Sequence, residues 1–93
     1  MKTEWDERKA VRNERKHGVS FDEAATVFLN PLALIFDDEW HSESEEREII
    51  IGHSTDGRPL VVSFTTREDV VRIISARLAT INEQKDYEEN TYR

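Results

Sequence analysis

Lys16 and His17 stand side by side, directly before Gly18, and together they have the residue types that phosphate chemistry needs. Lysine carries a fixed charge and histidine titrates near neutral pH, so the pair could transfer a proton or contact a phosphate. Basic residues are also ordinary in the last turn of a helix, where exposed carbonyl groups attract cations. Both interpretations stay open on the sequence alone.

Three arginines, Arg67, Arg72 and Arg77, follow at intervals of five residues. A guanidinium is a planar fork that suits phosphate better than a lysine does. Salt bridges to the acidic part of the chain are the alternative. In a continuous strand Arg72 and Arg77 point to opposite faces of the sheet, so at most one of them serves any given face.

Tyr87, in "KDYEE", is a further candidate. A helix tyrosine most often packs its ring on a sheet, and a role as proton donor or base-stacking surface is the alternative.

His41, Glu45, Glu46 and His53 are candidate metal ligands, because imidazole with carboxylate binds zinc or manganese. Their spacing matches no established metal motif. The chain also has no cysteine, which excludes disulfides and thiolate ligands. We therefore expect neither a metal nor another cofactor.

Charge is distributed unevenly over the 93 residues, whose formal net charge is −7. Residues 22–48 carry a net −8, whereas residues 1–21 carry +2. The overall field repels polyanions, and phosphate contacts need local lysine and arginine. Any phosphate site must therefore lie in a local cationic cluster such as that around Lys16 and His17.

Two helices are predicted near the N-terminus. The first spans about residues 6–16, is capped at its N-terminus by the Asp6 carboxylate, and ends at Gly18 in the left-handed conformation. In "SFDE", Ser20 and Glu23 form a capping box that begins the second helix, and "NP" at positions 30–31 stops it.

Strands dominate the remainder. "LALIF" predicts a strand, and "EREIIIGHS" and "RPLVVSFTT" flank Asp56 and Gly57, a strong hairpin signal. "VVRIISA" predicts a further strand, residues 78–89 a helix, and Trp5 an additional edge strand. The fold class is therefore α+β in one domain, residues 1–93: two N-terminal helices, an antiparallel meander of three or four strands, and a C-terminal helix.

The N-terminal segment "MKTEWDERKA" lacks the apolar run of a signal peptide. No stretch approaches the roughly 20 apolar residues that span a bilayer. We expect a cytoplasmic protein that has no contact with membranes.

Three segments, taken in order, carry a family resemblance: "WDERKAVRNERKHGVSFDEAATVF", "HSESEEREIIIGHSTDGRPLVVSFTTRED" and "RIISARLATINEQKDYE". Together, over about residues 5–88, they resemble the BrnT toxins of type II toxin–antitoxin systems. The resemblance implies a RelE-like fold and a ribonuclease that blocks translation. It also implies a BrnA antitoxin with a ribbon-helix-helix domain, a heterotetramer of the two proteins, and operator DNA bound only through the antitoxin.

The site implied by the resemblance uses Lys16 and His17 for proton transfer or charge, and Arg67 and Arg77 for the phosphate, with Tyr87 as a further catalytic candidate. A ribonuclease of this kind needs no metal, because the 2′-hydroxyl of RNA serves as the nucleophile. Two alternatives remain. One is a toxin-like binding module without activity that acts as an antitoxin-bound co-repressor, and the other is a small structural protein.

Overall fold

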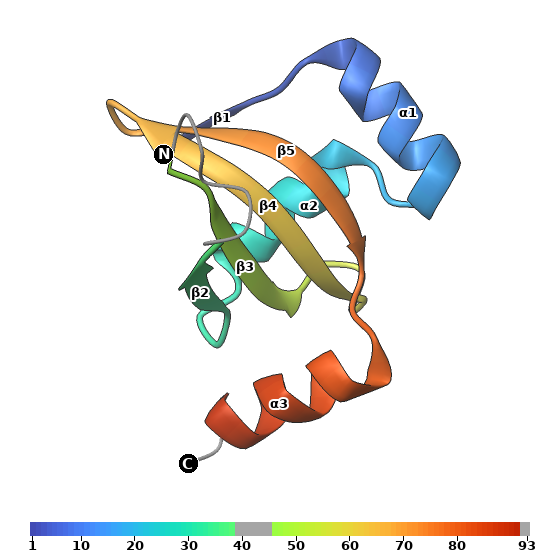
Figure 1. The fold of residues 1–93 in the computed structure, drawn as a ribbon, viewed down its shortest axis with the longest axis vertical. Coiled ribbons are helices and arrows are strands. Elements are labelled where there is room, and N and C mark those ends of the chain that lie inside the picture. Colours follow the sequence, from blue (N-terminus) through green and yellow to red (C-terminus); the bar gives the residue numbers. More distant parts are fainter. Residues whose placement is uncertain (39–45, 92–93) are drawn as a thin grey trace.

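A five-stranded sheet forms the centre of the computed structural model, which describes residues 1–38 and 46–91 (Figure 1). No helix within these residues has the length and apolarity that a bilayer crossing demands. In chain order the elements are β1 (Lys2–Glu4), α1 (Glu7–His17), α2 (Phe21–Thr26), the 3-10 turn η1 (Val27–Leu29), β2 (Leu34–Asp37), β3 (Glu48–His53), β4 (Pro59–Arg67), β5 (Val70–Leu78) and α3 (Ile81–Thr91).

The strand order is β1-β5-β4-β3-β2. Strands β2 to β5 form an antiparallel meander, and β1 pairs in parallel with β5 at the other edge. The predicted α+β class is confirmed, with all four predicted strands present. The predicted edge strand also exists, but it lies just before Trp5.

The two N-terminal helices begin and end where their capping residues stand. Asp6 accepts hydrogen bonds from two backbone amides of the first turn of α1, and Gly18 ends that helix at φ 69°. Ser20 accepts from the amide of Glu23, as predicted. The Glu23 carboxylate, however, accepts from Arg58 of the β3–β4 turn, because a guanidinium is the stronger partner.

The main core lies between α1, α2 and one face of the sheet. Its largest fully buried side chains are Phe21, Leu60, Ile73, Val19, Val27 and Val62. A smaller cluster lies on the opposite face, where Tyr87 of α3 packs with Ile51, Val61 and Ala79. Figure 1 shows α3 beyond the end of β5, away from α1 and α2.

A β-bulge interrupts the β4–β5 pair. The register shifts between Ser63 and Phe64, which leaves Ile74 of β5 as an extra residue. One extra residue reverses the alternation of side chains along the strand beyond it. Arg72 and Arg77 consequently lie on the same face of the sheet, and the prediction that they face opposite sides is wrong.

Candidate functional site

Helix α1 lies along the part of β5 that β1 does not cover. The side chain of Asn13, which is only 8% exposed, donates to the carbonyl of Ala76 at 2.8 Å and accepts from its amide at 3.1 Å. This two-way bond replaces the missing neighbour strand at that residue. It fixes the last turn of α1, with Lys16 and His17, against the edge of the sheet.

A shallow cavity of about 290 Å³ lies between α1 and the bulge of β5. Its lining residues are Lys9, Arg12, Asn13, Lys16, His17, Ile74 and Ser75. Three of them are cations, one is a histidine, and none is acidic. In a chain of net charge −7, this is a local anion-binding environment.

Arg77 lies on the other side of β5, where it forms a two-pronged ion pair with Glu83 of α3. The two nitrogen–oxygen distances are 2.7 and 2.8 Å, and the Leu78 carbonyl accepts a third bond at 3.3 Å. Hydrogen bonds from Arg77 lower the pKa of Glu83 from its ordinary 4.5 to about 2, and the same pair raises the pKa of Arg77. Since a guanidinium has five N–H donors, two remain for a phosphate.

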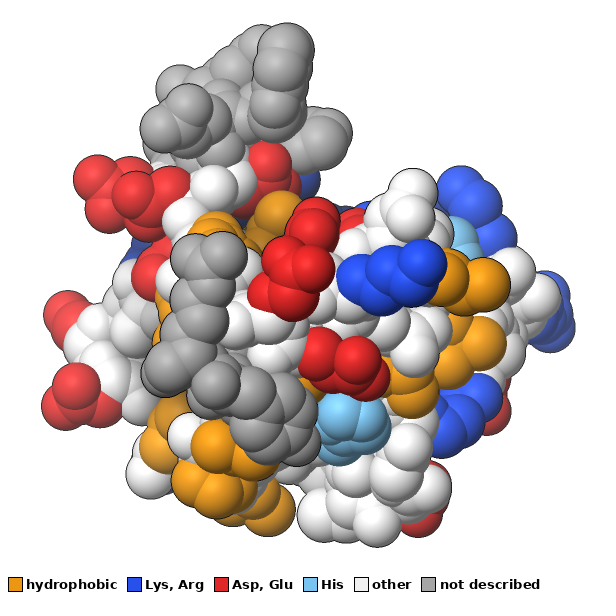
Figure 2. Space-filling view, turned by 90° about the horizontal axis from the view of Figure 1, so that it is seen from below, with side chains coloured by type: hydrophobic (Ala, Val, Ile, Leu, Met, Phe, Trp, Pro, Cys, Tyr) orange, Lys and Arg blue, Asp and Glu red, His pale blue; other side chains and the backbone are white. Residues whose placement is uncertain are grey.

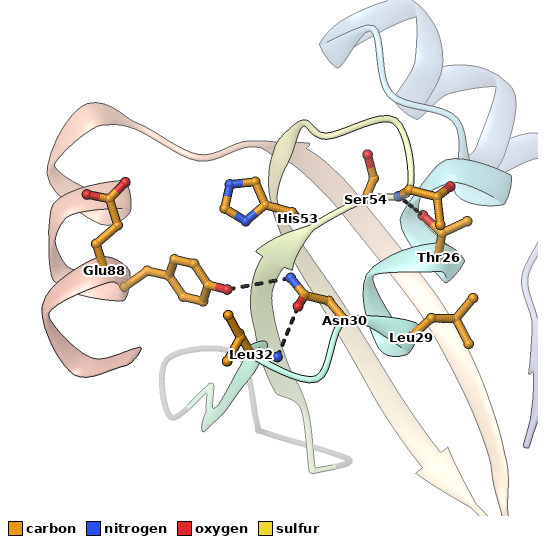
Figure 3. Close-up of a pocket in the computed structure, with 9 residues that line it drawn as sticks. Thr26, Leu29, Asn30, Leu32, His53, Ser54 and Glu88 are labelled. Atoms are coloured by element: carbon orange, nitrogen blue, oxygen red, sulfur yellow. Dashed lines mark hydrogen bonds between the residues drawn. The ribbon is translucent and has the colours of Figure 1, made fainter. Parts of the chain in front are cut away.

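Tyr87 lies where two cavities meet. Its side chain is 5% exposed and packs against the smaller core cluster, which confirms the packing role. It lines a groove of about 410 Å³ together with Arg77 and Glu83, and also a cavity of about 470 Å³ with His53 and Asn30 (Figure 3). Its hydroxyl accepts from the Asn30 amide at 3.5 Å, and its ring centroid lies 5.7 Å from that of His53.

Arg67 lies at the opposite end of the sheet from Arg77. It pairs with Val70 across the β4–β5 turn. At about 3.3 Å per strand residue, roughly 20 Å separates that pair from Arg77. Arg67 lines a separate cavity with Arg72, whose guanidinium pairs with Glu4 at 2.6 Å. Of the five predicted site residues, Lys16 and His17 thus line the cavity beside α1, whereas Arg77 and Tyr87 line a groove on the other side of β5. Arg67 lines a third cavity, away from both.

Arg72 and Arg77 each form an ion pair, whereas the salt-bridge alternative placed their partners in the acidic segment. Arg72 binds Glu4 of β1, and Arg77 binds Glu83 of α3. Both acidic partners lie outside residues 22–48. Close range decides the pairing, because Glu4 is the strand neighbour of Arg72 and α3 follows directly after Arg77.

A third ion pair, between Glu23 and Arg58, connects the turn of Gly18 to the β3–β4 hairpin. The Arg58 Nε donates to Glu23 at 2.9 Å, its Nη2 donates to the Gly18 carbonyl at 3.0 Å, and the Ser54 hydroxyl donates to Glu23 at 2.8 Å. These bonds lower the pKa of Glu23, with Arg58 as the largest cause. The network holds the end of α1, and with it His17, in place.

The sequence did not predict three residues that contact Arg77 or Tyr87. They are Asn30, Glu83 and, except as a metal ligand, His53. One signal was present, because "TINE" is a capping box in which the Thr80 hydroxyl accepts from the Glu83 amide at 3.1 Å. No local sequence pattern predicts that Asn30 and His53 lie at a common cavity.

Groups of three or more potential metal ligands do not occur within residues 1–38 and 46–91. Of the four candidate metal ligands, His41 and Glu45 lie outside the described residues.

Comparison with known proteins gives one family. Residues 5–83 match the family described as "Ribonuclease toxin, BrnT, of type II toxin-antitoxin system". The chain is also similar to the ribonuclease toxin BrnT of Brucella abortus, known from a crystal structure. The two share 26% identity, the match covers 86% of this chain and 97% of that one, and the TM-score is 0.67. No curated protein matches the chain.

Proposed function

Because the chain belongs to the BrnT family of ribonuclease toxins from type II toxin–antitoxin systems, we propose that it cleaves RNA without a metal ion and thereby inhibits translation. The observation that carries the proposal is the cavity between α1 and β5, which presents Lys9, Arg12, Lys16 and His17 with no acidic side chain in its lining. An RNA backbone is the polyanion that such a surface attracts, and the attraction is local enough to act despite the net charge.

The proposed reaction uses the substrate's own nucleophile. A base removes the proton of a 2′-hydroxyl, the oxygen attacks the adjacent phosphorus, and the bond to the 5′-oxygen breaks as that oxygen receives a proton. The products are a 2′,3′-cyclic phosphate and a free 5′-hydroxyl. Lys16 and His17 are the proposed groups for proton transfer or charge stabilisation, with the Tyr87 hydroxyl as a further proton donor.

Arg77 is proposed to contact the phosphate that is cleaved. Its bond to Glu83 holds the guanidinium in one orientation and leaves two N–H donors available. A preorganised charged donor of this kind contributes about 2.7–4 kcal/mol to transition-state stabilisation. Arg67 lies too far away to share that phosphate, so in this proposal it contacts the RNA backbone elsewhere.

The proposed partner is a BrnA-type antitoxin with a ribbon-helix-helix domain. We propose that the two proteins form a heterotetramer in the cytoplasm, that it binds operator DNA only through the antitoxin, and that the toxin has a RelE-like fold. The net −8 of residues 22–48 supports a basic partner segment, because complementary charge favours encounter and partner choice.

The test is expression of the chain without antitoxin, with growth and RNA integrity followed together. Wild type should arrest growth and degrade RNA, whereas Arg77→Ala and His17→Ala should each lose about a hundredfold in cleavage rate. Arg72→Ala is the matched control, because Arg72 lies on the same strand and face but lines a different cavity, where it pairs with Glu4. Purified protein should cleave equally well in EDTA.

Two outcomes would contradict the proposal. Growth arrest that persists in both variants would refute the residue assignment. Normal growth with folded wild-type protein that still binds its antitoxin would refute the activity and favour the inactive co-repressor.

A further inference from the structure

A second cavity, separate from the cationic one, opens between η1, the β3–β4 turn and α3, and it shares Tyr87 with the groove that contains Arg77. Its volume is about 470 Å³, within the range of small-molecule sites. We propose that it binds one nucleobase of the RNA, next to the phosphate that is cleaved. This inference rests on the proposed function, because it assigns one part of the RNA substrate, a base, to this cavity.

The side-chain amide of Asn30 is held at one wall of this cavity. Its oxygen accepts from the Leu32 backbone amide at 2.9 Å, and its nitrogen donates to the Tyr87 hydroxyl at 3.5 Å. An asparagine amide has two donors and two acceptor sites, so one of each remains. A donor and an acceptor on one planar group are what pairs with the edge of a nucleobase.

Gly52 of β3 allows the Asn30 loop to lie this close to the sheet. A Cβ atom at position 52 would lie 2.8 Å from the Ala33 Cβ and 3.1 Å from the Asn30 nitrogen. The placement of Asn30 is therefore built into the packing of the loop on the sheet.

The ring of His53 provides a platform for stacking. His53 is exposed, whereas Tyr87 behind it is buried. Leu29 and Leu32 are 71% and 47% exposed and both line this cavity, so its wall presents apolar surface to solvent. Figure 3 shows His53, Asn30 and Leu32 near one another, with Leu29 on the other side of Asn30. A base stacked on His53 would cover this apolar surface, as bases of single-stranded RNA do on aromatic side chains.

The charges around the cavity favour a neutral base and direct the phosphate elsewhere. Glu88 lines this cavity, and its carboxylate repels a phosphate. Tyr87 also lines the adjoining groove that contains Arg77, so the two sites are neighbours. The face seen in Figure 2 shows Asp and Glu side chains and an exposed histidine, with Lys and Arg side chains elsewhere on the same face.

The first test is a titration of purified wild-type protein with the four nucleoside 5′-monophosphates, followed by amide NMR. We expect saturable shifts at Asn30 and Thr55 that ribose 5-phosphate does not produce. Binding should weaken by about tenfold or more in His53→Ala. It should be unchanged in Asn82→Ala, an exposed asparagine of α3 that lines neither cavity. Equal shifts with ribose 5-phosphate, or shifts confined to α1, would overturn the proposal.

The second test maps the ends of RNA fragments that the wild type and Asn30→Ala produce. The wild type should prefer one base beside the cut, and the variant should cut more slowly and lose that preference. An unchanged preference would overturn the base site. Absence of cleavage by the wild type, with nucleotide binding intact, would instead refute the proposed function and support the base site as such.

Discussion

Glu83→Gln tests the ion pair that orients Arg77. The change keeps the shape of the side chain but removes its charge, and with it the charge-assisted bonds to both guanidinium nitrogens. Arg77 and Glu83 side chains are 42% and 33% exposed, so water and salt weaken the pair. The variant should therefore be less stable than wild type at neutral pH. The lowering of the pKa of Glu83 sets an upper limit on the loss of unfolding free energy.

The bound follows from linkage. The pKa of Glu83 falls from 4.5 to about 2 on folding, which at about 1.36 kcal/mol per unit of pKa corresponds to roughly 3 kcal/mol. Because the pair is partly exposed, we expect about 1–2 kcal/mol in practice. A carboxyl whose pKa is lower in the folded state stabilises it above pH 4.5, and the contribution disappears as the pH falls from 4.5 toward 2.

Urea unfolding at pH 7, 5, 4, 3 and 2.5 measures the effect. Wild type should lose stability over the acid range more steeply than Glu83→Gln, so that the two curves converge near pH 2. Glu88→Gln is the control, because Glu88 is an exposed carboxylate of the same helix; its curve should follow wild type. Parallel curves for wild type and Glu83→Gln between pH 5 and 2.5 would refute the reasoning.

Three further predictions concern other parts of the molecule. Glu23→Gln should cost about 1.5–3 kcal/mol of unfolding free energy at pH 7, because it removes the charged acceptor of Arg58. Urea titration measures this loss. A loss below about 0.5 kcal/mol, the size of an ordinary surface substitution, would contradict the prediction. Gly52→Ala should cost about 1–3 kcal/mol, because its Cβ would lie 2.8 Å from that of Ala33, and an unchanged melting temperature would refute this close packing. Lys16→Ala should lower the slope of log affinity for single-stranded RNA against log salt by about 0.7, one phosphate contact; a filter-binding series measures the slope, and an unchanged value would place Lys16 outside the RNA contact.

Local signals in the sequence were sufficient for most of the fold. Asp6, Gly18 and Ser20 cap helices through hydrogen bonds to residues that are close in the sequence. The helix ends that they predict are therefore confirmed. The Asp56–Gly57 hairpin is confirmed for the same reason, with Gly57 at φ 80°. Helix α3 was also predicted, although it begins about three residues later than expected.

Features that depend on distant residues were not predictable in this way. The bulge at Ile74 arises from pairing with β4, and it decided the faces of Arg72 and Arg77. The neighbourhood of Asn30 and Tyr87, 57 residues apart, arises from packing of α3 on the sheet. Proposed roles for the site residues are still predictions, because they depend on where RNA lies.

The parallel pairing of β1 with β5 determines how late during synthesis of the chain the sheet can be completed. Thr3 pairs with Val71, and Asn13 binds Ala76, 63 residues away. A nascent chain released from the ribosome up to β4 therefore lacks both the edge of its sheet and the surface that positions α1. The cationic cavity is lined by Ile74 and Ser75 of β5, so it cannot form until β5 has emerged and packed against α1.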